Sequence, residues 1–529
     1  MTPARPATLS TESMVASSHP LASQAGISVL ADGGNAVDAT LAMAAMTWLT
    51  LPGQCGIGGD AFAVVREPDG TVWTVGGSGY GPDGGTPGFY RDRGLSAVPL
   101  DGPLGVSVPG APAALDTLHR QGASRALTDL WEPAAVVAER GLPCSIKTRD
   151  DIRAALGAIR NDPSLAEVFT DSDSVPLVGT RLANADLART IREVASNPGS
   201  FYRGSLAHRC VEALRAGGAP FSGDEWELMH TVVPEVSLTG RYADAIIHQT
   251  PVPTPGWMVL QQAALCDGVV GFSPLLSAPA VSRMASAARI AFEDRFRWSG
   301  SENNAVERIL HPDNIAMQRK QLRAGGSGQF VVRGGDTTST VAVDSEGRAV
   351  SFIHSLAFTF GAKFTVPGTG IVLNNRLGRG AYLIEGHPNE IAPRRKPLHT
   401  LNAWIVTDDA GDLLHVGNTP GGDGQVQWNM QLLSHLLDHG LDPQEAVSAP
   451  RFTVFPGSDA DVIGSPPELR VEPAVDPAVR QELSDAGFTV TMQDPSGIIG
   501  SGQIISRDPR GVLFGGSDPR QEGVALGVG

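Results

Sequence analysis

The spacing of apolar residues predicts helices near the start of the chain and through its middle third. Residues 20–50 read as two helices around a GGN turn, where Gly33 and Gly34 can end the first helix and Asn35 or Asp38 can cap the second. The segments AFAVV and TVWTV, joined by PDG, predict a hairpin over 56–75. Residues 76–104 read as a loop rich in Gly and Pro, and residues 111–330 as mostly helical.

The pattern changes near residue 324. AGGSGQF (324–330) predicts a flexible polar segment, and strands dominate from there to residue 375, as STVAVD, AVSFIHSL and GIVLNN. A helix is expected over 426–440, followed by late strands in RVEP, FTVTMQ, GQIISRD and VLFGGSD. Because helices and strands do not alternate with a regular βαβ period, we expect layered α and β structure, not a doubly wound sheet.

Composition narrows the class of protein. The chain has 529 residues, of which 41% are hydrophobic and 18% charged, the balance of a globular protein with a large core. Its net charge of −16 disfavours nucleic acid and anionic membrane as partners. The longest apolar run, residues 39–52, is too short to span a membrane, and the N-terminus lacks the apolar region of a signal peptide. We therefore expect a cytoplasmic protein.

The cysteines predict no cofactor chemistry. Cys55, Cys144, Cys210 and Cys266 are far apart and form no CxxC pair, so neither a zinc site nor a disulfide framework is indicated. We expect four reduced, mostly buried thiols, no metal and no cofactor.

A series of motifs resembles the γ-glutamyltranspeptidase family, in the same order and over nearly the whole chain. Each motif alone is weak, and the specificity lies in their order. They are MVASSHPLASQAGISVLADGGNAVDATLA (14–42), PGQCGIGGDAFAVV (52–65), VPGAPAAL (108–115), PVPTPGWMVLQQ (251–262), AFEDRFRW (291–298), DTTSTVAVDSEGRAVSF (336–352), GTGIVLNNR (368–376), PRRKPLHTL (393–401), GNTPGGDGQ (417–425), APRF (449–452) and GGSDPR (515–520).

The resemblance implies an α+β fold, the four-layer αββα sandwich of N-terminal-nucleophile hydrolases. It also implies a precursor that cuts itself between Asp336 and Thr337. Residues 1–336 would become a large subunit and residues 337–529 a small one, associated as one intertwined catalytic unit. A homodimer of the processed unit is possible.

Thr337 is the implied catalytic nucleophile. A threonine hydroxyl needs a nearby base, and an N-terminal threonine carries one in its own α-amine, whose ordinary pKa is about 7.7–8.0. Within an uncut chain that nitrogen is an amide and cannot act as a base, so cleavage would activate the enzyme. Taken alone, TTSTVAVD reads equally as a strand with hydroxyls on one face.

Three further residues match the family's catalytic machinery. Ser355 stands where most members have a threonine that hydrogen-bonds the nucleophile. Gly421 and Gly422 match the oxyanion hole, where two backbone N–H groups would stabilise the negative charge that develops in acyl transfer. Without the resemblance, Ser355 would be an ordinary strand serine and the glycines a plain turn.

The substrate pocket departs from the family. The γ-glutamyl pocket needs an arginine in a region that falls on residues 77–88, which contain none, and an acidic residue where Arg379 stands. The usual Asn and Gln contacts fall on Ala357 and Arg376. Arg376 and Arg379 suit a carboxylate with no adjacent amine, although they could instead pair with protein carboxylates such as Glu385 or Glu390.

Two residues stand where the family usually has a pair of serines that contact the substrate carboxylate. Thr400 keeps a hydroxyl, whereas His399 could donate to an anion or lie at the surface.

The sequence favours a self-processing amidohydrolase or acylase for a small acidic acyl group. A true γ-glutamyl hydrolase or transpeptidase, removal of an oxalyl-type group in a natural-product pathway, and an inactive binding homologue remain as alternatives. The sequence does not identify the acyl group or the acceptor, or choose between hydrolysis and transfer.

Overall fold

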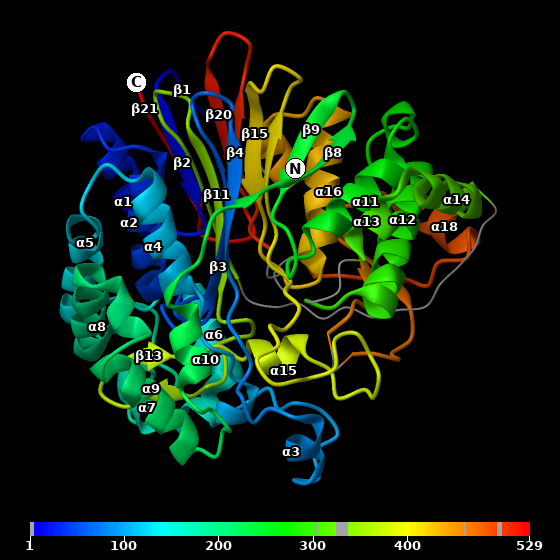
Figure 1. The fold of residues 1–529 in the computed structure, drawn as a ribbon. Helices are drawn as coiled ribbons and strands as arrows, with labels where there is room; N and C mark the ends of the chain where they lie inside the picture. Colours follow the sequence, from blue (N-terminus) through cyan, green and yellow to red (C-terminus); the bar gives the residue numbers. More distant parts are fainter. Residues whose placement is uncertain (1–4, 302–304, 324–336, 460–461, 495–499) are drawn as a thin grey trace.

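Two large antiparallel sheets stacked face to face form the centre of the molecule (Figure 1). The computed structural model describes residues 5–301, 305–323, 337–459, 462–494 and 500–529. One sheet, here called the β10 sheet, has the spatial order β21 (Val524–Val528), β2 (Ser13–Ser17), β10 (Thr338–Val343), β11 (Ala349–Ser355), β3 (Asp60–Arg66), β4 (Val72–Gly77) and β7 (Glu235–Val236). The β15 sheet has the order β1 (Thr8–Ser10), β20 (Leu513–Ser517), β19 (Gln503–Arg507), β15 (Leu413–Asn418), β14 (Ala403–Thr407), β9 (Ala245–Gln249) and β8 (Leu238–Tyr242).

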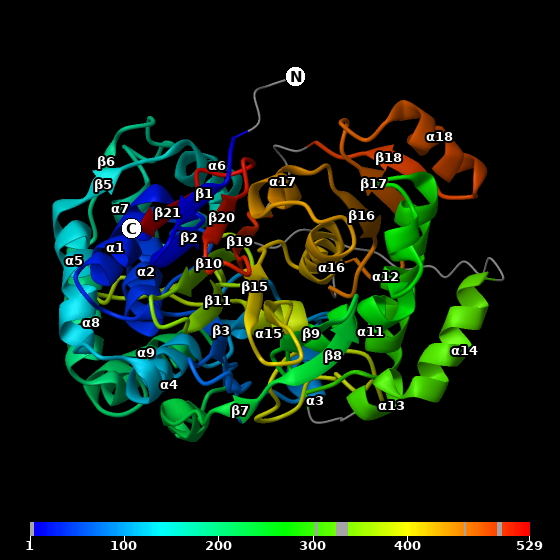
Figure 2. The same cartoon turned by 90° about the horizontal axis from the view of Figure 1, so that it is seen from above.

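Helices cover the outer face of each sheet (Figure 2). Outside the β10 sheet lie α1 (Pro20–Ala31), α2 (Ala36–Thr50), α4 (Ala111–Gly122), α5 (Leu127–Arg140), α8 (Ala185–Ser196) and α9 (Ser205–Ala216). Outside the β15 sheet lie α11 (Gly256–Cys266), α12 (Ala278–Trp298) and α16 (Gly424–Leu437), with α13 (Val306–Leu310), α14 (Pro312–Arg323), α17 (Pro443–Ser448) and α18 (Pro477–Asp485) around them.

The remaining elements are short or peripheral. The helices are α3 (Pro87–Arg91), α6 (Ile146–Ile159), α7 (Pro163–Phe169), α10 (Asp224–Glu227) and α15 (Arg376–Gly380). The small sheets pair β5 (Leu142–Pro143) with β6 (Arg181–Leu182), β12 (Thr365–Val366) with β13 (Ile371–Val372), and β16 (Phe452–Phe455) with β17 (Glu468–Val471) and β18 (Val490–Met492).

Separate apolar cores fill the spaces between the layers. One joins α1, α2, α4 and α5 to the β10 sheet, and a second joins α11, α12 and α16 to the β15 sheet. A third, which includes Phe62, Val341 and Ile405, lies between the sheets. Because each sheet is covered on both faces, its central strands are buried throughout, and the fold is the predicted αββα sandwich.

Several predicted elements are confirmed. The helices over 20–50 are α1 and α2, and Asn35 caps α2 in a reciprocal box with Asp38. The predicted hairpin is β3 and β4, and the helix expected over 426–440 is α16. The segment AGGSGQF lies outside the described residues.

Residues 111–323 are mostly helical, as predicted, but the prediction missed the strands β8 and β9. These strands form a hairpin at the edge of the β15 sheet. Their two-residue turn consists of Ala243 and Asp244, with φ of 47° and 65°. Such turns normally carry Asn-Gly or Asp-Gly, so Ala-Asp gave no hairpin signal.

All four cysteines are free and buried, as predicted. Of the helices in the described parts of the chain, none is both long and apolar enough to cross a bilayer.

Candidate active site

Thr337 lies directly before β10, with its side chain fully buried between the two sheets. Its Oγ1 donates to Ser355 Oγ at 3.2 Å and accepts from Gln425 Nε2 at 3.4 Å. Ser355 is the last residue of β11, and Gln425 stands in the first turn of α16. Residues from three elements therefore converge on the hydroxyl predicted to be the nucleophile.

A strained corner follows Ser355. The backbone N–H of Ala357 donates to Ser355 Oγ at 2.8 Å, and Ala357 has a φ of 87° although it carries a Cβ. Such a conformation costs roughly 1–3 kcal/mol and persists only where its surroundings enforce it. The corner fixes the Ser355 hydroxyl between Thr337 and the Ala357 amide.

Gly421 and Gly422 form the loop between β15 and α16, with φ of 131° and 58°. A Cβ on Gly421 would lie 2.0 Å from a ring carbon of Trp428, so only glycine fits there. Within the described residues, neither amide N–H donates a hydrogen bond to a protein acceptor. Two donors without protein partners at a helix N-terminus are suited to an oxyanion.

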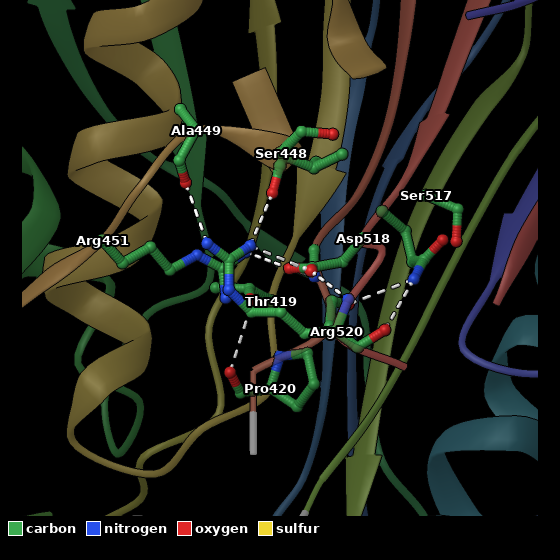
Figure 3. Close-up of polar contacts among 12 residues, drawn as sticks. Thr419, Pro420, Ser448, Ala449, Arg451, Ser517, Asp518 and Arg520 are labelled. Atoms are coloured by element: carbon green, nitrogen blue, oxygen red, sulfur yellow. Dashed lines mark hydrogen bonds and ion pairs between the residues drawn. The ribbon is translucent and has the colours of Figure 1, made fainter. Parts of the chain in front are cut away.

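A buried ionic network braces this loop, and Figure 3 shows it beside Thr419 and Pro420. Arg451 pairs with Asp518, while Arg520 forks onto Glu472 at 2.7 and 2.6 Å and reaches Asp518 at 3.1 Å. The Arg451 guanidinium also lies 5.4 Å from the centre of the Trp428 ring that packs on Gly421.

This network brings three of the sequence motifs together. APRF, GGSDPR and GNTPGGDGQ, which the sequence related only by their order, meet at this one position in the fold.

Arg376, the first residue of α15, is fully buried. Its Nε lies 3.5 Å from Asp60 Oδ2, and its Nη1 donates to Thr400 Oγ1 at 3.4 Å. In the described structure Nη2 has no hydrogen-bond partner. Burial lowers the pKa of Arg376 to about 10, which leaves the guanidinium charged at neutral pH. Arg376 is thus a cation with spare donors.

Arg379 is engaged by the protein. Its Nε and Nη2 fork onto Asp459 at 2.9 and 2.7 Å, and its Nη1 donates to the Ala357 carbonyl at 2.6 Å. The sequence alternative of pairing with a protein carboxylate named the wrong partners, because Asp459 holds Arg379 while Glu390 pairs with Arg91.

His399 is buried, so the alternative of a surface histidine is wrong. Its Nε2 lies 3.2 Å from Asp60 Oδ2, and its ring packs edge-on against Phe62. Burial, with a contribution from the Arg376 charge, lowers the pKa of His399 to about 3. The imidazole is therefore neutral at physiological pH.

Sequence reasoning missed three residues of this site: Asp60, Gln425 and Asp459. Asp60 and Gln425 stand in the motifs GIGGD and GGDGQ, where their position could have drawn attention to them. Asp459 lies outside every recognised motif, and only the fold brings it to Arg379.

The chain is similar to known proteins along nearly its whole length. The family model of gamma-glutamyltranspeptidase matches residues 22–528. The glutathione hydrolase-like YwrD proenzyme of Bacillus subtilis (strain 168) is 31% identical, over 98% of this chain and 99% of its own. The oxamate amidohydrolase proenzyme of Klebsiella pneumoniae is 30% identical, with coverage of 98% and 99%.

A solved cephalosporin acylase from Bacillus halodurans superposes with a TM-score of 0.91 at 29% identity, over 100% of this chain and 98% of that one. From the family match across nearly the whole sequence and from the shared fold, this self-processing enzyme belongs to the γ-glutamyltranspeptidase family of N-terminal-nucleophile hydrolases.

Proposed function

We propose that Thr337 is the nucleophile and that the chain cuts itself between Asp336 and Thr337 to expose it. The placement of the Thr337 hydroxyl supports this most directly, because it lies 3.2 Å from Ser355 Oγ and 3.4 Å from Gln425 Nε2. Gln425 itself follows Gly422 by three residues. Asp336 itself lies outside the described residues.

The same hydroxyl serves two reactions in this proposal. In maturation, Thr337 Oγ1 attacks the Asp336 carbonyl carbon, the amide C–N bond breaks as an ester forms, and water then hydrolyses the ester. The released α-amine has an ordinary pKa of about 7.7–8.0 and can take the hydroxyl proton in each later turnover. The Gly421 and Gly422 N–H groups would hold the oxyanion.

Arg376 is the group we assign to the substrate's acyl half. It is buried, charged and only partly satisfied, whereas the donors of Arg379 are held by Asp459 and Ala357. A cation in this position attracts a carboxylate or a polarised carbonyl and repels an ammonium. We therefore propose an acidic acyl group without an adjacent amine. The name of the oxamate amidohydrolase fits such a substrate.

A γ-glutamyl substrate is the second candidate, supported by the name of the relative from Bacillus subtilis. Its ammonium would need a free carboxylate. Of the two acids in the site, Asp60 faces the Arg376 guanidinium at 3.5 Å, and both oxygens of Asp459 accept from Arg379. This pairing places the γ-glutamyl group second.

Substitution of Thr337 tests the proposal. We expect Thr337→Ala to abolish both scission and turnover and Thr337→Ser to retain part of each, with fragments followed by denaturing electrophoresis. The N-terminal sequence of the smaller fragment should read TTSTVAVD. Near wild-type turnover by Thr337→Ala would make another residue the nucleophile. A panel of oxamate, glutaryl and oxalyl amides and γ-glutamyl-anilide then ranks the two substrate classes.

A further inference from the structure

A cavity of about 250 Å³ lies where the edges of the two sheets approach each other. Phe62, Gly76 and Ser78 line it from the β10 sheet, and residues 251–253 line it from the end of β9. Lys396 and Glu235 also contribute to its wall.

The strand register relates this cavity to Thr337. Ser355 pairs with Asp60, and Ala61 pairs with Gly77, which puts Ser78 level with Asp60. Thr337, Ser355, Asp60 and Ser78 thus form one row across the β10 sheet. Strands are spaced about 4.8 Å apart, so Ser78 lies roughly 14 Å from Thr337. Asp60, with Arg376 and His399, occupies the row between them.

Several polar groups of the cavity have no protein counterpart in the described residues, among them Ser78, Lys396 and the Ser301 hydroxyl. The Ser78 side chain is only 1% exposed, and its hydroxyl has no hydrogen-bond partner. The ammonium of half-buried Lys396 has no carboxylate within ion-pair distance and lies 4.9 Å from the centre of the Tyr80 ring. By contrast, the neighbouring Arg394 donates to Asp83 at 2.8 Å.

Glu235 limits the charge that the cavity can take. A Cβ built on Gly76 would lie 3.7 Å from Glu235 Oε1, so this carboxylate lies over the cavity wall. Burial raises the pKa of Glu235 and lowers the pKa of Lys396. The charge of each side chain partly offsets the pKa shift of the other. A single carboxylate on the Ser78 side is favoured over a multiply charged anion.

We propose that Lys396 and Ser78 form a second carboxylate subsite for the part of the substrate remote from the scissile amide. The inference rests on the proposed function and narrows it to amides that carry a carboxylate beyond the reach of Arg376. An unpaired ammonium and an unpartnered hydroxyl supply a charge and a directional donor, which is the pairing that a carboxylate needs.

Lysine labelling measures this binding without catalysis. The uncut Thr337→Ala chain is treated with acetic anhydride in the presence of butyrate, and modification of each lysine is followed by mass spectrometry. We expect butyrate to protect Lys396 but not exposed Lys320, and neutral butyramide to protect neither. Ser78→Ala should weaken protection about tenfold, as expected for losing a hydrogen bond to a charged group. Glu235→Gln should strengthen it.

Equal protection by butyrate and butyramide, or none by butyrate, would overturn the subsite. So would weaker protection in Glu235→Gln. In the processed wild type, Lys396→Met should raise KM for substrates with a remote carboxylate and leave kcat and scission unchanged, with Lys320→Met as the matched control. Because protection of Lys396 by butyrate requires neither scission nor turnover, failure of the Thr337 proposal would leave the labelling result interpretable.

Discussion

At the scale of single residues, the charges around the active site are arranged as compensated buried pairs. Arg376 faces Asp60 at 3.5 Å, and Arg379 forks onto Asp459 at 2.7–2.9 Å. The first pair is loose and leaves donors free, whereas the second is a closed bidentate contact. Arg376 therefore has donors that can bind an anion, whereas Arg379 stabilises the structure of the site.

The Arg379–Asp459 pair should matter for folding stability. Asp459→Asn leaves a buried guanidinium without its counter-charge, which typically costs about 3–5 kcal/mol. Arg379→Met combined with Asp459→Asn should cost less than the sum of the single changes, as thermal unfolding of the uncut Thr337→Ala chain can measure. The exposed pair Arg241–Asp409 is the matched control, because Asp409→Asn should cost at most about 1 kcal/mol. Equal losses in Asp459→Asn and Asp409→Asn would contradict a structural role.

Ser355 should affect both scission and stability. Ser355→Ala removes the contact to Thr337 and leaves the buried Ala357 N–H unpaired, a cost of about 1–3 kcal/mol. We expect scission to slow about tenfold, the kinetic equivalent of one lost hydrogen bond. Ser355→Thr, which keeps the hydroxyl, should retain most of the rate. Ser351 lies on the same strand but donates to Gly417, so Ser351→Ala should lose stability without slower scission. An equal delay in both alanine variants would remove the specific role of Ser355.

At the scale of elements, the sequence predicted those whose signals are local. The Asn35 cap and the helical spacing of 20–50 identify α1 and α2, and PDG identifies the β3–β4 hairpin. The β8–β9 hairpin was missed because its turn contains Ala243 and Asp244, which carry no usual turn signal. Elements recognised by local chemistry are thus predictable, whereas those held by tertiary contacts are not.

The candidate site also has residues that the sequence predicted and contacts that only the fold revealed. Thr337, Ser355, Gly421 and Gly422 were found through motif order, and the structure gathers them around one hydroxyl and one loop. Their exact partners required the fold. The Asp459 contact spans 80 residues of sequence from Arg379, and no periodic pattern reports such a distance.

The β15–α16 loop gives a prediction at this scale. Gly421→Ala would place its Cβ 2.0 Å from the Trp428 ring, so the loop or the ring must move. Displacement of one oxyanion donor typically costs about 10²–10³ in rate, which substrate turnover by the processed protein would measure. Gly440 follows α16 with a φ of 64° and open space around it, so Gly440→Ala should cost about 1 kcal/mol of stability and little rate. Similar rates in the two variants would argue against the oxyanion assignment.

At the scale of the whole molecule, the proposed fragments are interleaved strand by strand. In the β10 sheet, β21, β10 and β11 come from residues 337–529, whereas β2, β3, β4 and β7 come from residues 1–336. β2 pairs with β21 on one side and with β10 on the other. In the β15 sheet, β1 and the β8–β9 hairpin of the first part flank four strands of the second. Neither part can form either sheet alone.

We therefore expect the two fragments to remain associated as one complex after scission. Under native conditions both fragments should elute together at the size of the uncut Thr337→Ala chain, whose mass is about that of the 55.2 kDa sequence or a multiple of it. Denaturing electrophoresis of the same fraction should show two bands. The physical reason is that separation would break the ladders β2–β10, β2–β21 and β11–β3 and expose the core between the sheets. Elution of the fragments as separate folded species would contradict this, because each would then need a sheet built from its own strands.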